Sequence, residues 1–216
     1  MNVDLAGRLV IIIGGGVVAE RKVRGILALD AEVAVRVIAP AMTDVLRELA
    51  DSGQIEWRED RYAGGMLEGA FLVYAATDSP SVNAEVAAEA KRLGLLVNVI
   101  DDPNASSFQL PATLRRGDFL LTVSTGGGSP ALSRAIRIEM EQLYPPAFGL
   151  WLERVARLRS ELQEALPSSR ERTRFWRMAL RPHLLDMIRN GELEKAEVEL
   201  RNAALDIGAK SSNGSG

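Results

Sequence analysis

The chain has 216 residues, of which 47% are hydrophobic and 25% charged, as is usual for a globular protein with a sizeable core. It has no cysteine and one histidine, which excludes disulfides, thiolate metal sites and multi-histidine sites within one chain, so we expect no metal site. A net charge of −3 offers no basic field for nucleic acid. The apolar run at 9–13 is too short for a signal peptide or membrane span. We therefore expect a cytoplasmic protein with neither a nucleic-acid nor a membrane partner.

The first half of the chain alternates short apolar runs with segments of helical periodicity. The predicted strands are 8–13, 33–38, 55–58, 70–76 and 95–100, and the predicted helices are 17–29, 43–50 and 81–93. Thr43 suits a helix N-cap and Gly94 a helix C-terminus. Strands separated by helices of this length predict a doubly wound parallel sheet of the Rossmann type, so the fold class is α/β.

The pattern changes after about residue 108. Two extended runs, 109–114 and 119–124, flank a polar turn and predict an antiparallel pair. Pro130 suits the first position of a helix over 131–143. Further helices are predicted near 148–166, 170–189 and 192–206, followed by a Ser/Gly-rich tail that we expect to be disordered. The α/β sheet is thus followed by an α+β segment and a small all-helical domain.

Residues 14–19, Gly-Gly-Gly-Val-Val-Ala, fit the G-x-G-x-x-G/A pattern between a predicted strand and a predicted helix. The first glycine permits the tight turn, the second lets the backbone approach a pyrophosphate, and Ala19 allows close helix–strand packing. Helix N–H groups and the helix dipole then favour the anion. The alternative is a glycine turn in a fold that has lost its ligand. The predicted dinucleotide-binding residues here are Gly14, Gly16, Val17, Val18 and Ala19.

The second predicted strand ends Val-Ile-Ala-Pro at Pro40, without the acidic residue that usually holds a ribose 2′-hydroxyl. Arg36 lies within this strand and could instead point toward a 2′-phosphate. These residues leave the choice between NAD and NADP open.

Four stretches, with a fifth that follows the third, carry a specific resemblance. They are Ile13–Lys22 (IGGGVVAERK), Ala75–Asp78 (AATD), Asn98–Asp101 (NVID) with Ala105–Phe108 (ASSF), and Ser124–Pro130 (STGGGSP). In this combination and order the chain resembles the precorrin-2 dehydrogenase and siroheme synthase family over roughly residues 5–145. The last third matches only in being helical.

The resemblance implies an NAD-binding domain over 1–113, a dimerisation segment over 114–146 that exchanges with its twin, and a helical domain over 147–210, with 211–216 as the tail. It implies a homodimer that oxidises a tetrapyrrole, precorrin-2, to sirohydrochlorin with NAD. Some members also insert ferrous iron, and the sequence does not separate these two activities. A non-catalytic nucleotide-sensing module is the alternative from another class, and the 126–130 segment counts against it.

The resemblance makes Asp101 the catalytic aspartate, which would take a proton from the macrocycle. It lies just past a predicted strand, where doubly wound folds bind ligands. The alternative is that Asp101 only starts the turn before Pro103, and for Asp102 we favour that role. The other residues expected along the cofactor are Pro40, Thr77, Asp78, Asn98 and Val99. For Thr77 and Asp78 a helix-capping role is an equal alternative.

Residues 126–129 would present N–H groups and a hydroxyl at a helix N-terminus, which suits a substrate carboxylate. Ser129 could equally be a helix cap. The arginines around this segment could bind carboxylates, although a solvated charged face is the simpler reading for any one of them. The predicted substrate-binding residues are Ser124, Gly126, Gly127, Ser129 and Arg134. We expect His183 to be structural or exposed.

Overall fold

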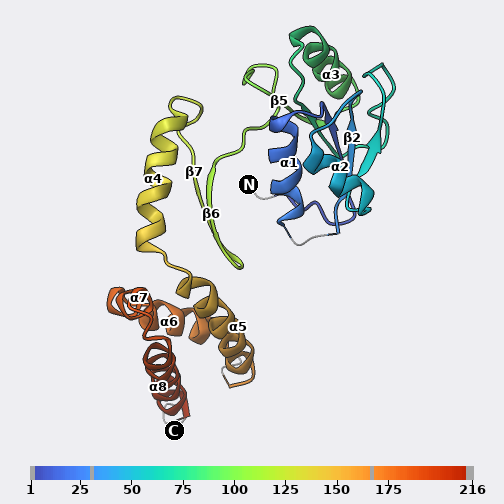
Figure 1. The fold of residues 1–216 in the computed structure, drawn as a ribbon. Helices are drawn as coiled ribbons and strands as arrows, with labels where there is room; N and C mark the ends of the chain where they lie inside the picture. The colour runs from blue at the N-terminus through green and yellow to red at the C-terminus, as the bar shows by residue number, and fades with distance from the viewer. Residues whose placement is uncertain (1–2, 30–31, 166–167, 213–216) are drawn as a thin grey trace. The chain divides into compact units, whose positions relative to one another are not determined.

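The computed structural model describes residues 3–29, 32–165 and 168–212. The chain forms two compact units, one ending at Leu110 and the other beginning at Pro111 (Figure 1). No helix among the described residues is long and apolar enough to cross a membrane. Of the tail expected at 211–216, the last four residues lie outside the described ranges.

The first unit is built on a five-stranded parallel sheet. Its strands are β1 (Leu9–Ile13), β2 (Ala34–Ile38), β3 (Glu56–Arg58), β4 (Leu72–Ala75) and β5 (Leu96–Val99). Their spatial order is β3-β2-β1-β4-β5. The order reverses between β1 and β4, and ligands bind outside the carboxyl ends of the strands at such a point. The predicted doubly wound sheet is confirmed.

Three helices cover the sheet: α1 (Val17–Leu27), α2 (Asp44–Asp51) and α3 (Pro80–Arg92). Thr43 caps α2 as predicted, because its hydroxyl accepts the N–H of Leu46. Ser79 caps α3, whose first residue is Pro80. The chain leaves α3 at Gly94, which has φ +70°, a conformation that glycine adopts without strain.

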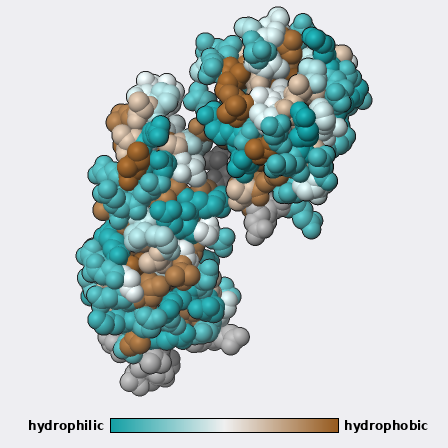
Figure 2. Space-filling view, viewed as in Figure 1, coloured by the Kyte–Doolittle hydropathy of each residue, from teal (hydrophilic) through white to brown (hydrophobic). Residues whose placement is uncertain are grey.

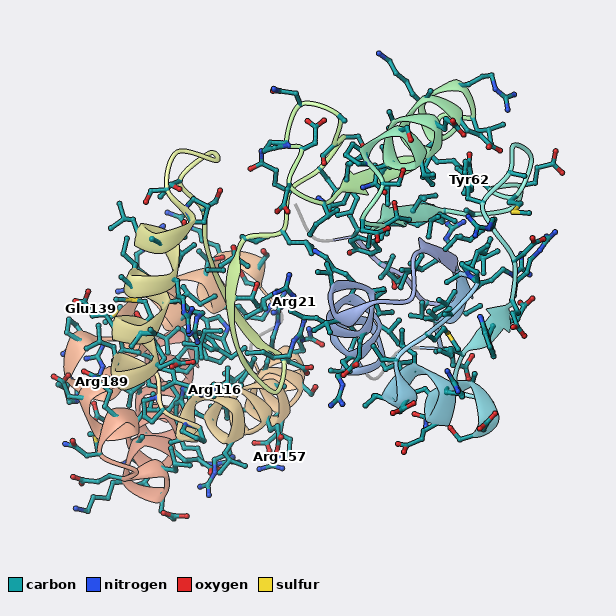
Figure 3. All side chains as sticks on the ribbon, turned by 45° about the horizontal axis from the view of Figure 1, so that its top comes forward. Arg21, Tyr62, Arg116, Glu139, Arg157 and Arg189 are labelled. Carbon is teal, nitrogen blue, oxygen red and sulfur yellow. The ribbon has the colours of Figure 1, made fainter. Side chains whose placement is uncertain are left out.

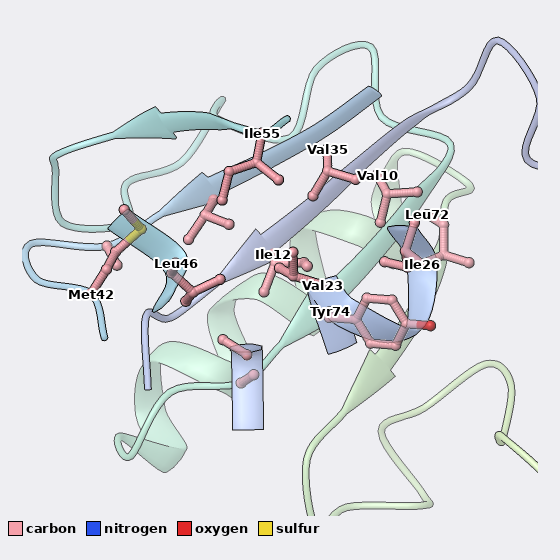
Figure 4. Packing of buried hydrophobic residues seen from close by; sticks show 14 residues of the cluster. Val10, Ile12, Val23, Ile26, Val35, Met42, Leu46, Ile55, Leu72 and Tyr74 are labelled. Atoms are coloured by element: carbon pink, nitrogen blue, oxygen red, sulfur yellow. The ribbon is translucent and has the colours of Figure 1, made fainter. Parts of the chain in front are cut away.

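The core of the first unit lies on both faces of the sheet. Along β1, Val10 and Ile12 join the cluster under α1 and α2 (Figure 4). Ile11 and Ile13 join the cluster on the opposite face, which includes Val86 of α3. Successive strand residues point to opposite faces, and here both faces are covered by helices. This explains why β1 reads as a continuous apolar run.

The second unit begins with an antiparallel hairpin of β6 (Ala112–Arg116) and β7 (Phe119–Val123). Helix α4 (Pro130–Leu143) packs against both strands. Its outer surface keeps Leu132, Ile138 and Leu143 about half exposed. Figure 2 shows apolar colour over this part of the molecule.

Four helices complete the second unit: α5 (Ala147–Ala165), α6 (Ser169–Ala179), α7 (Pro182–Arg189) and α8 (Leu193–Ser212). The prediction of one helix over 170–189 is wrong. Pro182 disfavours helical geometry at the preceding residue, and Arg181 is extended, with ψ 159°, so the chain breaks there. Helix α8 runs past its predicted end at 206 and two residues into the expected tail. Phe175, Trp151 and Leu184 lie in the core between these helices.

Candidate functional site

The glycine loop joins β1 to α1 at the switch point of the sheet. Gly14 has φ +116°, and a Cβ on it would lie 2.3 Å from the carbonyl oxygen of Ala76. Its N–H donates to Ile38. Gly15 was treated as a spacer in the motif, but a Cβ there would lie 2.1 Å from the carbonyl oxygen of Ala41. The first two glycines therefore let three strand ends approach closely, and the run of three glycines was the available signal for Gly15.

Gly16 meets a different need. A Cβ on Gly16 would have no atom within 4 Å, so the space before it is open to a ligand. No side chain caps α1, which leaves helix N–H groups available to an anion. Val17 is 75% exposed beside them, Val18 is half-buried, and Ala19 is fully buried between helix and sheet. These features fit a dinucleotide pyrophosphate.

The one cationic side chain within β2 (Ala34–Ile38), that of Arg36, is already paired. Pro40 is exposed just past the strand. Arg36 lies in the middle of β2 opposite Glu56 of β3, and the two form an ion pair at 2.8 Å. The idea that Arg36 points toward a 2′-phosphate is therefore not supported, because this guanidinium is engaged across the sheet.

Thr77 follows β4 at the same sheet edge, but its polar atoms are occupied. Its hydroxyl and its backbone N–H both donate to the side-chain oxygen of the buried Asn83, and Asn83 donates back to the Thr77 carbonyl. Sequence reasoning missed Asn83, which fixes this turn. Ser79, not Thr77 or Asp78, caps α3. Asp78 is exposed and has no hydrogen-bond partner among the described residues.

Asn98 and Val99, at the end of β5, bond to α1 and to the segment that follows the Asp101 turn. The Asn98 amide donates to the carbonyl oxygen of Phe108 at 3.1 Å and accepts from Lys22 at 3.5 Å. The Val99 N–H donates to the hydroxyl of Ser106. The side chain of Asn98 and the N–H of Val99 thus have partners within the chain.

Asp101 occupies the turn directly after β5 with φ +55°, the only non-glycine residue with positive φ in the described ranges. It is exposed, and its carboxylate has no hydrogen-bond partner among the described residues. The Asp102 carboxylate, by contrast, accepts the N–H groups of Asn104 and Ala105, both at 3.0 Å. Asp102 therefore builds the turn, as expected, and the Asp101 carboxylate is left free.

The half-buried Lys22 and the buried Tyr74 form a cation–π contact that the sequence did not reveal. The Lys22 ammonium lies 5.1 Å from the centre of the Tyr74 ring. Burial, with Arg21 nearby, lowers the pKa of Lys22. Burial also raises the pKa of Tyr74 to about 12. Both groups are thus disfavoured in their charged forms by the apolar face of the sheet.

Tyr62 and Glu89 form a hydrogen-bonded pair. Tyr62, labelled in Figure 3, donates to the buried carboxylate of Glu89, which also accepts the Gly65 N–H at 2.9 Å. Burial and then the hydrogen bond to Glu89 raise the pKa of Tyr62 well above its ordinary value. These bonds fix the segment after β3 onto α3.

In the second unit, the loop before α4 is held by its own hydroxyl groups. Ser129 is an N-cap, since its hydroxyl accepts the N–H of Leu132 at 3.2 Å. The Ser124 hydroxyl accepts the Gly126 N–H. Thr125, whose role the sequence did not reveal, accepts the N–H groups of Gly128 and Ser129 through its carbonyl and its hydroxyl. Within 126–129, Gly127 alone has an amide without an acceptor in the described structure, so this loop offers fewer donors than expected.

The arginines of β6 and α4 differ in their engagement. Arg134 is exposed and has no polar partner among the described residues. Arg137 pairs with Glu141 one turn later. Arg116, labelled in Figure 3, donates to the carbonyl oxygens of Tyr144 and Arg115. Arg134 is therefore the cation best placed on α4 to meet a carboxylate from outside.

His183 lies in the first turn of α7, and its exposed ring is within hydrogen-bond distance of the Glu199 carboxylate of α8, with Nε2 2.6 Å from one carboxylate oxygen. This agrees with the structural role expected for it. Within the described ranges, no three His, Cys, Asp or Glu side chains gather where they could hold a metal ion.

Comparison with known proteins shows two family models that match this chain. Residues 1–112, slightly more than half of the chain, match the model of the family described as "Putative NAD(P)-binding". The chain belongs to this NAD(P)-binding family. The expected class of cofactor is thereby confirmed. Residues 147–203 match a second model, the sirohaem synthase dimerisation region. That range lies in the expected helical domain, so the assignment of dimer contacts to 114–146 stays a prediction.

The relatives bear out the resemblance to siroheme synthases. The chain is 36% identical to the siroheme synthase of Photorhabdus laumondii over 198 residues, which are 92% of this chain and 42% of that protein. It is 42% identical to the siroheme synthase of Methylococcus capsulatus, over 90% of this chain and 40% of that protein. The chain thus spans about two fifths of the length of these relatives.

A solved structure has the same fold. The protein "SirC, precorrin-2 dehydrogenase" superposes with a TM-score of 0.73 and 24% sequence identity, covering 96% of this chain and 97% of that one. The predicted fold class, a Rossmann sheet followed by an α+β segment and a helical part, is confirmed.

Proposed function

We propose that this chain catalyses the NAD-dependent dehydrogenation of precorrin-2 to sirohydrochlorin in siroheme synthesis. The observation that carries the proposal is the free carboxylate of Asp101. It follows β5 at the same sheet edge as the glycine loop that follows β1, because the carboxyl ends of parallel strands share one edge. A cofactor loop and an unbonded acid–base group at one edge suit an oxidation that releases a hydride and a proton.

The reaction removes two hydrogens from the macrocycle. NAD, when bound, takes up the hydride. Asp101 takes the proton, because a carboxylate with no internal partner keeps its oxygens available as acceptors. Gly16 and the N-terminus of α1 hold the pyrophosphate, and Thr77, Asp78, Asn98 and Val99 line the same edge. NAD is favoured over NADP because the cation of β2, Arg36, is already paired with Glu56.

The substrate is recognised by its carboxylates. We assign their binding to the loop over Ser124, Gly126, Gly127 and Ser129 and to Arg134. Because Ser124 and Ser129 use their hydroxyls within the loop, the free Gly127 amide and the Arg134 guanidinium supply the donors. A tetrapyrrole with several carboxylates suits such donors.

The active form is a homodimer in the cytoplasm. Support comes from the match to a dimerisation region and from the half-exposed Leu132, Ile138 and Leu143 of α4, whose apolar surface favours a protein partner. We keep the division into 1–113 for NAD, 114–146 for dimerisation and 147–210 for the helical domain, with 211–216 as tail.

An anaerobic assay with purified protein, precorrin-2 and NAD tests the proposal. Wild type should form sirohydrochlorin. Asp101→Asn should lose about 10²–10⁴-fold in kcat while still binding NAD. Asp102→Asn is the matched control, since an amide oxygen can still accept the two turn N–H groups, and it should stay within about twofold of wild type.

Two further results define the limits of the proposal. NAD binding without any oxidation by wild type would contradict the dehydrogenase and favour a nucleotide-sensing module. If Asp101→Asn still oxidised precorrin-2 at the wild-type rate, Asp101 would not be the catalytic base. Ferrous iron added to the product would reveal the chelatase alternative if siroheme formed faster than without protein.

A further inference from the structure

Ser106 lies in a stretch, Ala105–Phe108, to which the proposed reaction gives no task. Its hydroxyl bridges the two sides of the turn that carries Asp101. It accepts the N–H of Val99, the last residue of β5, at 2.9 Å, and it donates to the carbonyl oxygen of Asp102 at 2.8 Å. One hydroxyl therefore ties the residue before the turn to the residue after Asp101.

The neighbouring Ser107 makes an equivalent bridge farther back along the strand. Its hydroxyl accepts the N–H of Val97 at 2.8 Å and lies 3.2 Å from the Val97 carbonyl oxygen. Strand β5 is at the edge of the sheet, so its outward N–H groups have no partner strand, and the two serines satisfy them instead. Ser106 and Ser107 thus perform the same edge-covering task, but only Ser106 also reaches the Asp101 turn.

Asp101 needs such support because its backbone is strained. A left-handed conformation is unfavourable for a residue with a Cβ, somewhat less so for aspartate, and it persists only where the surroundings impose it. On one side the Ile100 N–H donates to Ala75 at 2.9 Å. On the other, Ser106 holds the Asp102 carbonyl and Asp102 closes its own turn. The flanks of Asp101 are fixed while its carboxylate stays free.

We infer that Ser106 is a positioning residue for Asp101: its hydroxyl holds the turn after β5 in the left-handed conformation that presents the carboxylate to the substrate. The inference rests on the proposed function for its catalytic consequence. Its geometric content, that the Ser106 hydroxyl imposes the positive φ of Asp101, stands independently.

The experiment compares Ser106→Ala with Ser107→Ala and Ser106→Thr in the full-length chain. Each alanine variant loses the partner of one edge N–H, so similar losses of thermal stability are expected. Ser106→Ala should also lose about 10- to 100-fold in kcat, as expected for a misplaced catalytic group, with KM and the NAD dissociation constant within about twofold of wild type. Ser107→Ala should keep its kcat, and Ser106→Thr, which retains the hydroxyl, should recover it.

Equal kcat losses in the two alanine variants would overturn the inference, because they would reflect stability alone. Unchanged kcat in Ser106→Ala would overturn it as well. Should wild type fail to oxidise precorrin-2, the proposed function fails, and the geometric claim is then decided by the three-bond HN–Hα coupling of Asp101, which reports φ. A coupling that changes in Ser106→Ala but not in Ser107→Ala supports the claim, and identical couplings in all three proteins overturn it.

Discussion

The turn after β5 in the first unit and the loop before α4 in the second unit both carry predicted site residues, yet their hydroxyl groups do opposite jobs. In the first, the Ser106 hydroxyl binds backbone so that the neighbouring Asp101 carboxylate stays free. In the second, the predicted residues Ser124 and Ser129 are themselves the anchors. A side chain available for chemistry is thus recognised by what its neighbours bond, not by its residue type.

The two units also treat ionisable groups differently. The first buries Glu89, Tyr74 and part of Lys22 around its sheet. The second places ion pairs on its surface, where Arg154 and Arg201 of neighbouring helices share Glu197. Surface pairs are screened by salt and contribute little. We therefore expect pH to act mainly on the first unit and ionic strength on the second.

The largest effect is expected at the glycine loop. Substitutions there distinguish Gly15, which is required for packing, from Gly16, which leaves space for a ligand. Gly15→Ala places a Cβ 2.1 Å from a backbone oxygen and should lower the free energy of unfolding by about 3 kcal/mol, as measured in urea. Gly16→Ala is the matched control. Its Cβ meets nothing within 4 Å, so stability should hold while NAD binding weakens by about tenfold or more. If Gly16→Ala bound NAD as tightly as wild type, the pyrophosphate would not bind against Gly16.

A smaller effect tests the buried groups through pH. Tyr74 has its pKa raised to about 12 in the folded protein, against about 10 when unfolded. The unfolded state then releases the proton first, so stability falls as pH rises from 10 to 12. At pH 11 the loss should be on the order of 1 kcal/mol relative to pH 8, and it should be absent in Tyr74→Phe. Lys22 acts with the opposite sign because its folded pKa is lowered, and it remains present in both proteins.

The contradicting result is a loss of equal size in wild type and in Tyr74→Phe, since that would assign the alkaline transition to other groups. A matched measurement in high salt distinguishes the two units, because screening weakens the surface pairs of α5 and α8 but leaves the desolvation of Tyr74 unchanged.

The sheet could be predicted from sequence because its signal is local. Apolar strands, helical spacing and the glycine motif each occupy a few consecutive residues, and the parallel doubly wound arrangement followed from their alternation along the chain. The break at Arg181 was missed although Pro182 signalled it, because apolar residues continue on both sides. The partner of Thr77 and the residue that supports the Asp101 turn were also missed. Asn83 and Ser106 are ordinary polar residues, and only the folded chain shows which backbone groups they bind.

The smallest effect is expected for Ser129, and it tests whether the hydroxyl groups of the loop before α4 act only as anchors. Loss of the N-cap in Ser129→Ala should cost about 1 kcal/mol, measured by urea unfolding. Ser129→Asp keeps a good cap and should retain stability, but its carboxylate beside the free Gly127 amide should repel a carboxylated substrate and raise KM with little change in kcat. If Ser129→Ala instead raised KM as much as Ser129→Asp did, the hydroxyl itself would contact the substrate. In that case the loop before α4 would differ further from the Asp101 turn, because its anchor would also contact the substrate. The chemistry allows this, since the cap bond leaves the serine hydroxyl its own proton to donate.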